Sequence, residues 1–181
     1  MSHILLTLAP YHVLSYGTLL GTQVFHTFIN SILSFKVLER PQFAILQRAV
    51  FPAYFGIQTA APVLLALTYP GSKNPLGVAS SLAGVFHPSN RWGVLAPLGT
   101  ILVTGLVNLV YLLPETNKIT ALRREQEKKD GKASYEKGSH SEEMTALNKK
   151  FGQLHGISSL ANLITVIATV VYGINLSSRL V

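Results

Sequence analysis

The sequence has no cysteine and very little charge, because Asp, Glu, Lys and Arg together make up only 13% of its 181 residues. Without cysteine, disulfides, thiol catalysis and cysteine metal sites are all excluded. Soluble domains carry about 25% charged residues, so this chain has few groups for a solvated surface. Its formal net charge of +7 would favour nucleic acid in a soluble protein. Here the basic residues flank apolar runs, which indicates orientation in a membrane and no nucleic acid partner.

Charged residues are absent from four apolar stretches that are long enough to cross a lipid bilayer, which takes about 20 residues. The predicted spans lie near residues 11–35, 50–69, 93–113 and 151–176. A soluble four-helix bundle is the alternative, but four charge-free helices would leave it no solvated face. The sequence therefore predicts a single all-α domain over residues 1–181, a polytopic membrane protein built as a bundle of four transmembrane helices.

Proline and glycine mark the connections between these spans. Pro41 is well placed for the first turn of the second helix. Pro62 predicts a kink inside the second span, because it removes a backbone hydrogen bond. Residues 70–92 are rich in Gly, Pro, Ser and Asn, which predicts a loop with one short helical turn around residues 80–86.

Most of the charge lies in one segment, residues 115–150, between the third and fourth spans. Residues 117–129 place apolar side chains at helical spacing among charges, which predicts an amphipathic helix along the membrane surface. Residues 131–139 have no apolar pattern and are predicted to be mobile. Ser141 is a candidate N-cap for a helix whose apolar stripe runs straight into the fourth span.

The distribution of basic residues predicts the orientation of the chain. Four spans put both termini on one side, and the loops 36–49 and 114–150 on the other side hold most of the lysines and arginines. By the positive-inside rule these two loops are cytosolic. We expect an integral protein of an endomembrane, with the endoplasmic reticulum favoured and a mitochondrial membrane as the alternative. The lipid bilayer is thus the first expected partner.

Polar side chains recur at spacings of three and four in the first and fourth spans, so they form a seam along one face of each helix. Lipid offers such groups no partner, and the two seams are therefore expected to face each other. An antiparallel register pairs Asn30 with Ser158, His26 with Asn162, Gln23 with Thr165, and Tyr16 with Tyr172. The candidate packing or binding residues of all spans are His12, Tyr16, Gln23, His26, Asn30, Gln58, Asn108, His155, Ser158, Asn162 and Thr165.

Two interpretations of these polar residues stay open. They can be interhelical hydrogen bonds worth about 0.6 kcal/mol a pair, or they can line a polar pathway between the first and fourth spans. Two glycine pairs raise a similar alternative. Gly17 with Gly21, and Gly152 with Gly156, permit close helix approach either inside the chain or in a dimer.

The sequence gives little support to catalysis. His12 and His26 lie fourteen residues apart, which is roughly 21 Å along a helix, so they cannot bind one metal ion. No Asp or Glu lies inside a span to complete a metal site or to orient a histidine, and no G-x-S-x-G motif occurs. We expect neither a metal site nor a cofactor, and we expect that the protein is not an enzyme.

Four blocks of residues carry a family resemblance. They are Gly21-x-Gln23-x-x-x-Thr27-Phe28; Leu38-x-Arg40-x-x-Phe43-x-x-x-Gln47-x-x-x-Phe51-Pro52-x-Tyr54-Phe55; Asn108 with Pro114; and Phe151-x-x-x-His155-Gly156-x-Ser158-Ser159-Leu160-x-Asn162-Leu163. In these blocks the chain resembles the transmembrane protein 205-like family. The resemblance implies a four-span membrane protein, and because the family's domain has no established biochemical activity it assigns no catalytic residue.

Two classes of function remain in competition. A non-enzymatic scaffold or partner-binding subunit of a membrane complex is favoured, because packing accounts for every feature described above; its partners would be other membrane proteins or further copies of the chain. A transporter of small molecules or lipids is the alternative, since a kinked helix and polar groups inside the membrane are typical of transport pathways.

Overall fold

The computed structural model describes residues 7–71 and 79–178, and these residues form helices and connections with no β-strand among them. The first long helical rod combines α1 (Ala9–Val24), the π-helix η2 (Phe25–Asn30) and α2 (Ser31–Val37). The second rod is α3 (Arg40–Leu67), the third joins η3 (Pro88–Asn90), η4 (Arg91–Leu95), α5 (Ala96–Leu106), η5 (Val107–Leu112) and α6 (Leu113–Asp130), and the fourth is α7 (Glu142–Ser177).

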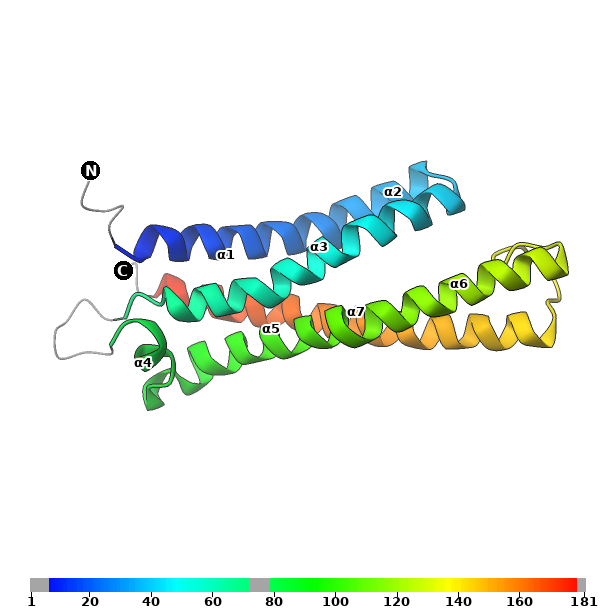
Figure 1. The fold of residues 1–181 in the computed structure, drawn as a ribbon. Coiled ribbons are helices and arrows are strands. Elements are labelled where there is room, and N and C mark those ends of the chain that lie inside the picture. The colour runs from blue at the N-terminus through cyan, green and yellow to red at the C-terminus, as the bar shows by residue number, and fades with distance from the viewer. Residues whose placement is uncertain (1–6, 72–78, 179–181) are drawn as a thin grey trace.

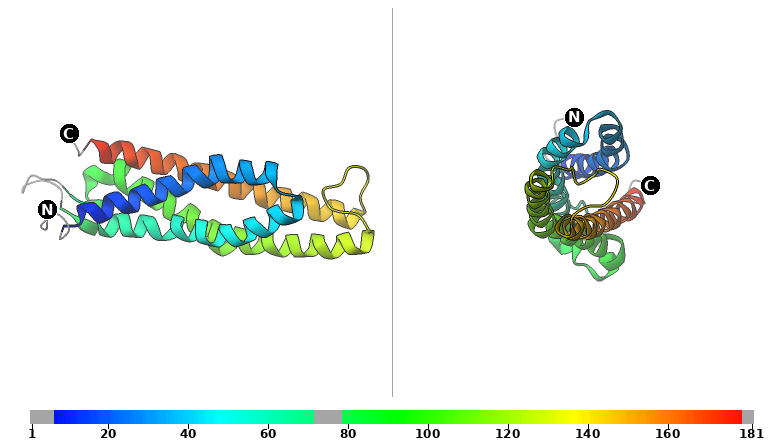
Figure 2. Two further views of the ribbon diagram at one scale, coloured as in Figure 1. Left: turned by 90° about the horizontal axis from the view of Figure 1, so that it is seen from above. Right: turned by 90° about the vertical axis from the view of Figure 1, so that its right-hand side faces the viewer.

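The rods run up and down beside one another in an elongated bundle (Figure 1). The start of α1, the end of α7 and the short helix α4 (Ser81–Val85) lie at one end. The turn between α2 and α3 and the turn between α6 and α7 lie at the other end, and the end-on view shows the helices gathered around one long axis (Figure 2). This arrangement confirms the all-helical fold class, and α4 confirms the short helical turn predicted in the 70–92 loop.

Three helices are long and apolar enough to cross a membrane, where the sequence predicts four spans. Within the described residues they are Arg40–Leu67, Pro88–Asp130 and Glu142–Ser177. The first rod is helical throughout but is not among them, because polar side chains such as His12, Gln23 and His26 lower its hydropathy. The first span therefore stays a prediction, although its helix lies alongside the other three.

Proline positions explain several of the local helix geometries. Helix α3 begins at Arg40 with Pro41 in its first turn, as predicted, and continues through Pro52 and Pro62. In the third rod, wider π-turns precede two further prolines. The Ala96 amide donates to the Arg91 carbonyl just before Pro97, and the Leu113 amide donates to the Asn108 carbonyl just before Pro114. A π-turn relieves the clash between a proline ring and the preceding turn, so the helix passes through.

The charged segment differs from its prediction as a loop with a surface helix. Beyond Pro114 the third rod continues as α6 to Asp130, and α7 begins at Glu142, so most of residues 115–150 is helical. Ile119 is buried against Leu112 and Leu154, which places α6 on α7 rather than flat on the membrane. The third rod has 43 residues, about 65 Å at 1.5 Å per residue, which exceeds the roughly 30 Å hydrocarbon core. The third rod is thus about twice as long as a membrane crossing requires, and α6 forms its charged half.

Hydrogen bonds tie the connection between α6 and α7 to both helices, although residues 131–139 are predicted to be mobile. Arg123 Nη2 donates to Ser134 Oγ at 3.0 Å, and Asn148 Nδ2 donates to the Ser134 carbonyl at 3.1 Å. The Ser134 amide donates to Glu127 Oε1 at 2.8 Å. Ser141 Oγ accepts from the Met144 amide at 3.2 Å, which confirms the predicted N-cap of α7.

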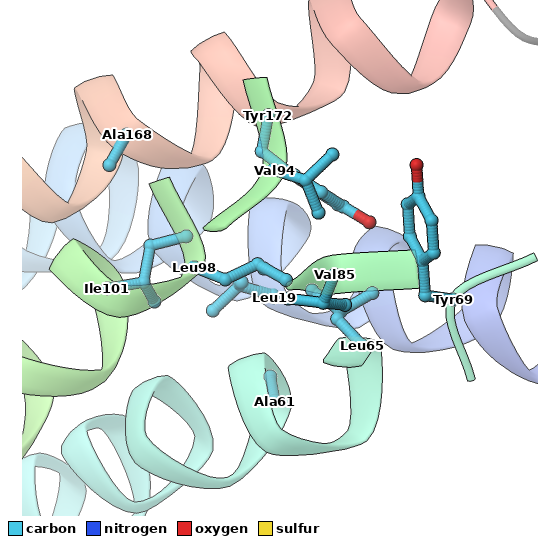
Figure 3. Packing of buried hydrophobic residues seen from close by; sticks show 10 residues of the cluster. All are labelled: Leu19, Ala61, Leu65, Tyr69, Val85, Val94, Leu98, Ile101, Ala168 and Tyr172. Carbon is cyan, nitrogen blue, oxygen red and sulfur yellow. The ribbon is translucent and has the colours of Figure 1, made fainter. Parts of the chain in front are cut away.

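An apolar cluster fills the bundle toward the end that holds α4. Figure 3 shows side chains from α1, α3, α5 and α7 converging there, with Tyr69 and Val85 closing the outer side. Its fully buried members include Leu19, Leu65 and Ile101. Farther along the bundle, Gly105 lets α5 approach α3 closely, since a Cβ added there would lie 3.1 Å from the backbone of Gln58. On the side of Leu19 away from α4, the interior of the bundle is polar, and it contains the candidate site.

Candidate functional site

A cluster of polar side chains joins three of the four rods in the bundle interior. Tyr54 Oη donates to Asn162 Oδ1 at 2.7 Å, and Gln58 Nε2 donates to the same oxygen at 2.8 Å. Asn162 Nδ2 donates to Thr27 Oγ1 at 3.1 Å, and Thr27 Oγ1 lies 3.1 Å from Tyr54 Oη. We call these four residues, Thr27, Tyr54, Gln58 and Asn162, the central cluster. It connects η2, α3 and α7.

The hydrogen-bond directions within the central cluster follow from its geometry. Since Tyr54 gives its only proton to Asn162, the Thr27 hydroxyl must donate to Tyr54 while accepting from Asn162. Every group of Thr27, Tyr54 and Asn162 is then paired. Gln58 is fully buried, and its Oε1 has no partner. Turning both amides round would pair Oε1 with Asn162 but would leave Gln58 Nε2 alone, so one amide atom stays unpaired either way.

Other amides in the interior are also incompletely paired. Gln23 is 0% exposed, and neither its Oε1 nor its Nε2 has a partner. Asn108 is buried in η5; its Oδ1 accepts from Ser158 Oγ at 2.6 Å, and its Nδ2 has no partner. Gln47, nearer the α2–α3 turn, leaves both amide atoms unpaired. Unpaired buried amides are unfavourable in a solvent-free interior, and the protein's own side chains leave these amide groups of the interior unsatisfied.

Of the four side-chain pairs predicted between the first and fourth spans, one is in contact and three are not. The rings of Tyr16 and Tyr172 pack with centroids 6.1 Å apart, as predicted. His26 instead bonds within its own rod, and Asn162 reaches the neighbouring Thr27. The other predicted pairs have been replaced by contacts with the third rod and within the first rod: Ser158 with Asn108 of η5, Thr165 with Thr104 of α5, and Asn30 with His26. The prediction failed because it paired two helices in isolation, whereas α3 and the third rod supply the nearer partners.

A second set of polar contacts joins the rods at the end of the bundle that holds α4. Tyr172 Oη lies 2.8 Å from His12 Nε2, and His12 Nδ1 lies 3.0 Å from Thr68 Oγ1. Thr68 already donates its proton to the Leu64 carbonyl, so its oxygen accepts from His12 Nδ1–H. His12 Nε2 must then accept from Tyr172. Three rods meet at this fully paired histidine.

His155 and the predicted glycine contacts lie outside the interior. His155 is exposed and stacks on Phe151 with ring centroids 5.9 Å apart, so its predicted place in the seam is wrong. Nothing lies within 4 Å of a Cβ added at any of four glycines. These are the members of the two predicted pairs: Gly17, Gly21, Gly152 and Gly156. Within the described residues, these four glycines therefore do not mediate close helix packing.

His26 lies in a π-helix that no proline explains. The next proline after η2 is Pro41, whereas η4 and η5 directly precede prolines. The π-turn lets Ser31 Oγ approach His26 Nε2 to 3.5 Å, while Asn30 Nδ2 lies 3.2 Å from His26 Nδ1. The other side of the ring packs on Tyr54, with centroids 4.4 Å apart. Isolated π-turns frequently occur at functional sites, which singles out η2.

A groove opens between η2 and α3 next to His26. It is an open surface groove of about 630 Å³. Small or apolar residues such as Gly21, Ala53 and Ile57 line most of it. Its polar lining residues are Thr22, His26, Asn30 and Tyr54. The groove thus reaches the outer side of the central cluster and opens toward the surroundings of the bundle.

Sequence reasoning missed three members of this polar interior: Thr27, Tyr54 and Thr104. Thr27 and Tyr54 are fixed positions of the blocks that carry the family resemblance, which could have identified both residues. Tyr54 also stands one helical turn before Gln58, and this spacing places it on the same face of the helix. Thr104 gives no such signal, because a threonine in an apolar helix commonly bonds its own backbone. Among the described residues, no group of three or more His, Asp or Glu side chains could hold a metal ion.

Comparisons with known proteins bear on this architecture. A fungal relative from Aspergillus fumigatus, described as xanthocillin biosynthesis cluster protein D, is 34% identical over 173 residues, which cover 96% of this chain and 91% of the relative. No solved structure matches the chain. A family model described as a domain of unknown function, DUF4149, matches residues 14–125, which include the helices from α1 into α6. The chain therefore belongs to the DUF4149 family of proteins.

Proposed function

We propose that this chain is a non-enzymatic, four-span membrane protein that acts as a subunit of a membrane complex, with further copies of itself as its partners. The open glycine pairs carry this proposal. Gly17 and Gly21 stand one turn apart on α1, and none of the described residues comes within 4 Å of a Cβ added at either position. Such pairs let helix backbones approach closely in lipid. Leu14, on the same face, is 67% exposed. The resemblance to the transmembrane protein 205-like family supports the four-span architecture.

Cysteine crosslinking tests self-association, because the native chain has no cysteine. A Leu14→Cys variant in native membranes should form a disulfide-linked dimer on mild oxidation. Adding Gly21→Leu should abolish the crosslink by covering the glycine face. Gly99→Leu is the matched control, since Gly99 is equally open but has no glycine one turn away. A Leu14→Cys variant that stays monomeric, or that crosslinks equally well with Gly21→Leu, would contradict the proposal.

A small-molecule or lipid transporter is the second candidate, and the groove at His26 favours it. The name of the fungal relative associates that protein with a biosynthesis cluster, which is consistent with the handling of a small organic molecule. An Ala53→Cys variant places a thiol in the groove, and Val103→Cys, at an exposed position of α5, is the lipid-facing control. If only Ala53→Cys reacts with a membrane-impermeant thiol reagent, the groove is part of an aqueous path. Equal protection of both thiols excludes that path.

The same proposal includes an orientation and a location. The α2–α3 turn and the α6–α7 hairpin face the cytosol, because both are rich in basic residues. The endoplasmic reticulum is the favoured membrane. Fluorescence microscopy of the tagged chain against organelle markers tests the location, and a mitochondrial pattern would replace it with the alternative.

A further inference from the structure

Contacts between the rods show which residues lie at the same depth in the bundle. Thr27 contacts Tyr54 across the antiparallel first and second rods. One turn from Thr27 toward the start of α1 leads to Gln23, and one turn from Tyr54 toward the end of α3 leads to Gln58. Gln23 therefore lies level with Gln58. The packing of Tyr16 on Tyr172 gives the depth relative to α7 in the same way.

The third and fourth rods contribute to this level as well. Gln23 lies two turns after Tyr16 on the first rod, and Thr165 lies two turns before Tyr172 on α7. Because the two rods are antiparallel, Gln23 and Thr165 lie at the same depth. Thr165 Oγ1 lies 2.6 Å from Thr104 Oγ1 of α5, and the neighbouring Gly105 packs on the backbone of Gln58. All four rods thus place a polar or small residue at one depth. We call this set the polar layer: Gln23, Gln58, Thr104, Asn162 and Thr165.

The polar layer has hydrogen-bonding capacity that the chain does not use. Both amide atoms of Gln23 and one of Gln58 have no partner, although both residues are 0% exposed. The threonines of the layer are satisfied, since one hydroxyl donates to the other and the second donates to a backbone carbonyl of its own helix, that of Ala161 for Thr165 or of Thr100 for Thr104. The unused groups are therefore amide donors and acceptors from α1 and α3, at a depth where lipid cannot pair them.

The chemistry of the layer indicates what would pair these amides. It contains only neutral groups, with no carboxylate to stabilise a cation and no base to stabilise an anion. A primary amide offers two donors and one acceptor oxygen, which suits a small uncharged molecule that both donates and accepts. Buried waters typically make about three such bonds to otherwise unsatisfied groups.

We infer that the polar layer is a hydration site, in which at least one bound water joins the amide of Gln23 to that of Gln58. This water links the first and second rods at a depth where direct hydrogen bonds connect α3 to α7 and α5 to α7. The inference does not depend on the proposed subunit function, because it concerns the interior of one chain.

Replacement of Gln23 by methionine tests the inference, because methionine has similar length and no hydrogen-bonding amide. If water pairs the Gln23 amide, Gln23→Met should lower the midpoint of thermal unfolding in detergent by about 2 °C or more. Gln23→Asn keeps the amide and leaves room for a second water, so it should recover part of the loss. Leu19→Met, on the same helix in the apolar cluster, controls for the packing of methionine.

A measurement on the unmodified protein accompanies the variants. Selective labelling of glutamine side-chain amides should show magnetisation transfer from water to the Gln23 amide by NMR, and this signal should disappear in Gln23→Met. A rise in the unfolding midpoint of Gln23→Met would show that the amide is unpaired and would overturn the inference. A fall without water transfer would also overturn it, because Gln23 would then bond directly to the protein.

Discussion

Tyr54 and Asn162 lie 108 residues apart in the chain, and their side chains meet in a 2.7 Å hydrogen bond between α3 and α7. The amide of Asn162 also accepts from Gln58 and donates to Thr27. One asparagine thus makes three side-chain hydrogen bonds to two other rods. Such a group is hard to replace, because no other side chain of its size offers both a donor and an acceptor at these positions.

We expect Asn162→Leu to lower the free energy of unfolding by about 1–3 kcal/mol for each polar partner that it leaves unpaired. Tyr54→Phe should have a smaller effect, since Asn162 keeps Gln58 as a donor. In the double variant part of the loss should be recovered, because the hydroxyl that Asn162→Leu leaves unpaired is then absent. Thermal unfolding in detergent measures all three variants. Ser159→Leu, at an exposed position of α7, is the control, and strict additivity of the two single effects would contradict the hydrogen bond.

A second prediction concerns the closure of the bundle at His12. Tyr172→Phe removes the donor to His12 Nε2 and should lower the free energy of unfolding by about 1–3 kcal/mol. The effects of Tyr172→Phe and His12→Leu should be non-additive because the two side chains are in contact. Tyr172→Phe and Asn162→Leu lie ten residues apart on α7, about 15 Å along the helix, and should add within about 0.5 kcal/mol. Coupling between that second pair would show that the two polar regions form one network.

The third prediction tests whether Arg123 restrains the connection between α6 and α7. Its Nε donates to Asn148 Oδ1 at 2.8 Å, its Nη2 to Ser134, and its guanidinium lies 4.3 Å from the ring centre of Phe151. Lysine cannot reproduce this fork and stacking. Arg123→Lys should therefore speed trypsin cleavage after Lys137 by about tenfold, the factor that corresponds to a loss of 1.4 kcal/mol from local stability.

The neighbouring Arg124→Lys provides the matched control for that measurement, because Arg124 is exposed. Its cleavage rate should equal that of the unmodified chain. If Arg123→Lys and Arg124→Lys are cleaved at the same rate, the hydrogen bonds of Arg123 do not restrain the connection.

The fourth prediction addresses orientation. In sealed vesicles with the cytosolic face outward, trypsin should cut between α6 and α7, after Lys132 or Lys137, because these residues lie outside the regular helices. Arg91, at the opposite end of the bundle, should be protected until detergent is added. Cleavage at Arg91 with an intact hairpin would mean that the chain is inserted the other way round.

Much of the fold could be predicted from the sequence, because apolar length decides where helices cross a membrane and basic residues mark the turns. The continuation of the third rod through Pro114 could not, since it depends on a π-turn whose hydrogen bonds leave no sequence pattern. The same holds for the partners of Asn162. Periodicity shows which face of a helix is polar, but which neighbour supplies Thr27, Tyr54 and Gln58 depends on the packing of all rods together.

Helix α7 differs mechanically from the other rods. The first contains the π-helix η2, the second contains two internal prolines and the third contains two π-turns, whereas α7 is one regular α-helix of 36 residues without proline. It is therefore the most regular of the four rods, and it extends from the α6–α7 turn to Asn162 and beyond. Some 30 Å of unbroken helix, at 1.5 Å per residue, separates the Ser141 end from Asn162. A displacement of that end would therefore reach the hydrogen bonds of Asn162 without a proline or π-turn in between to absorb it.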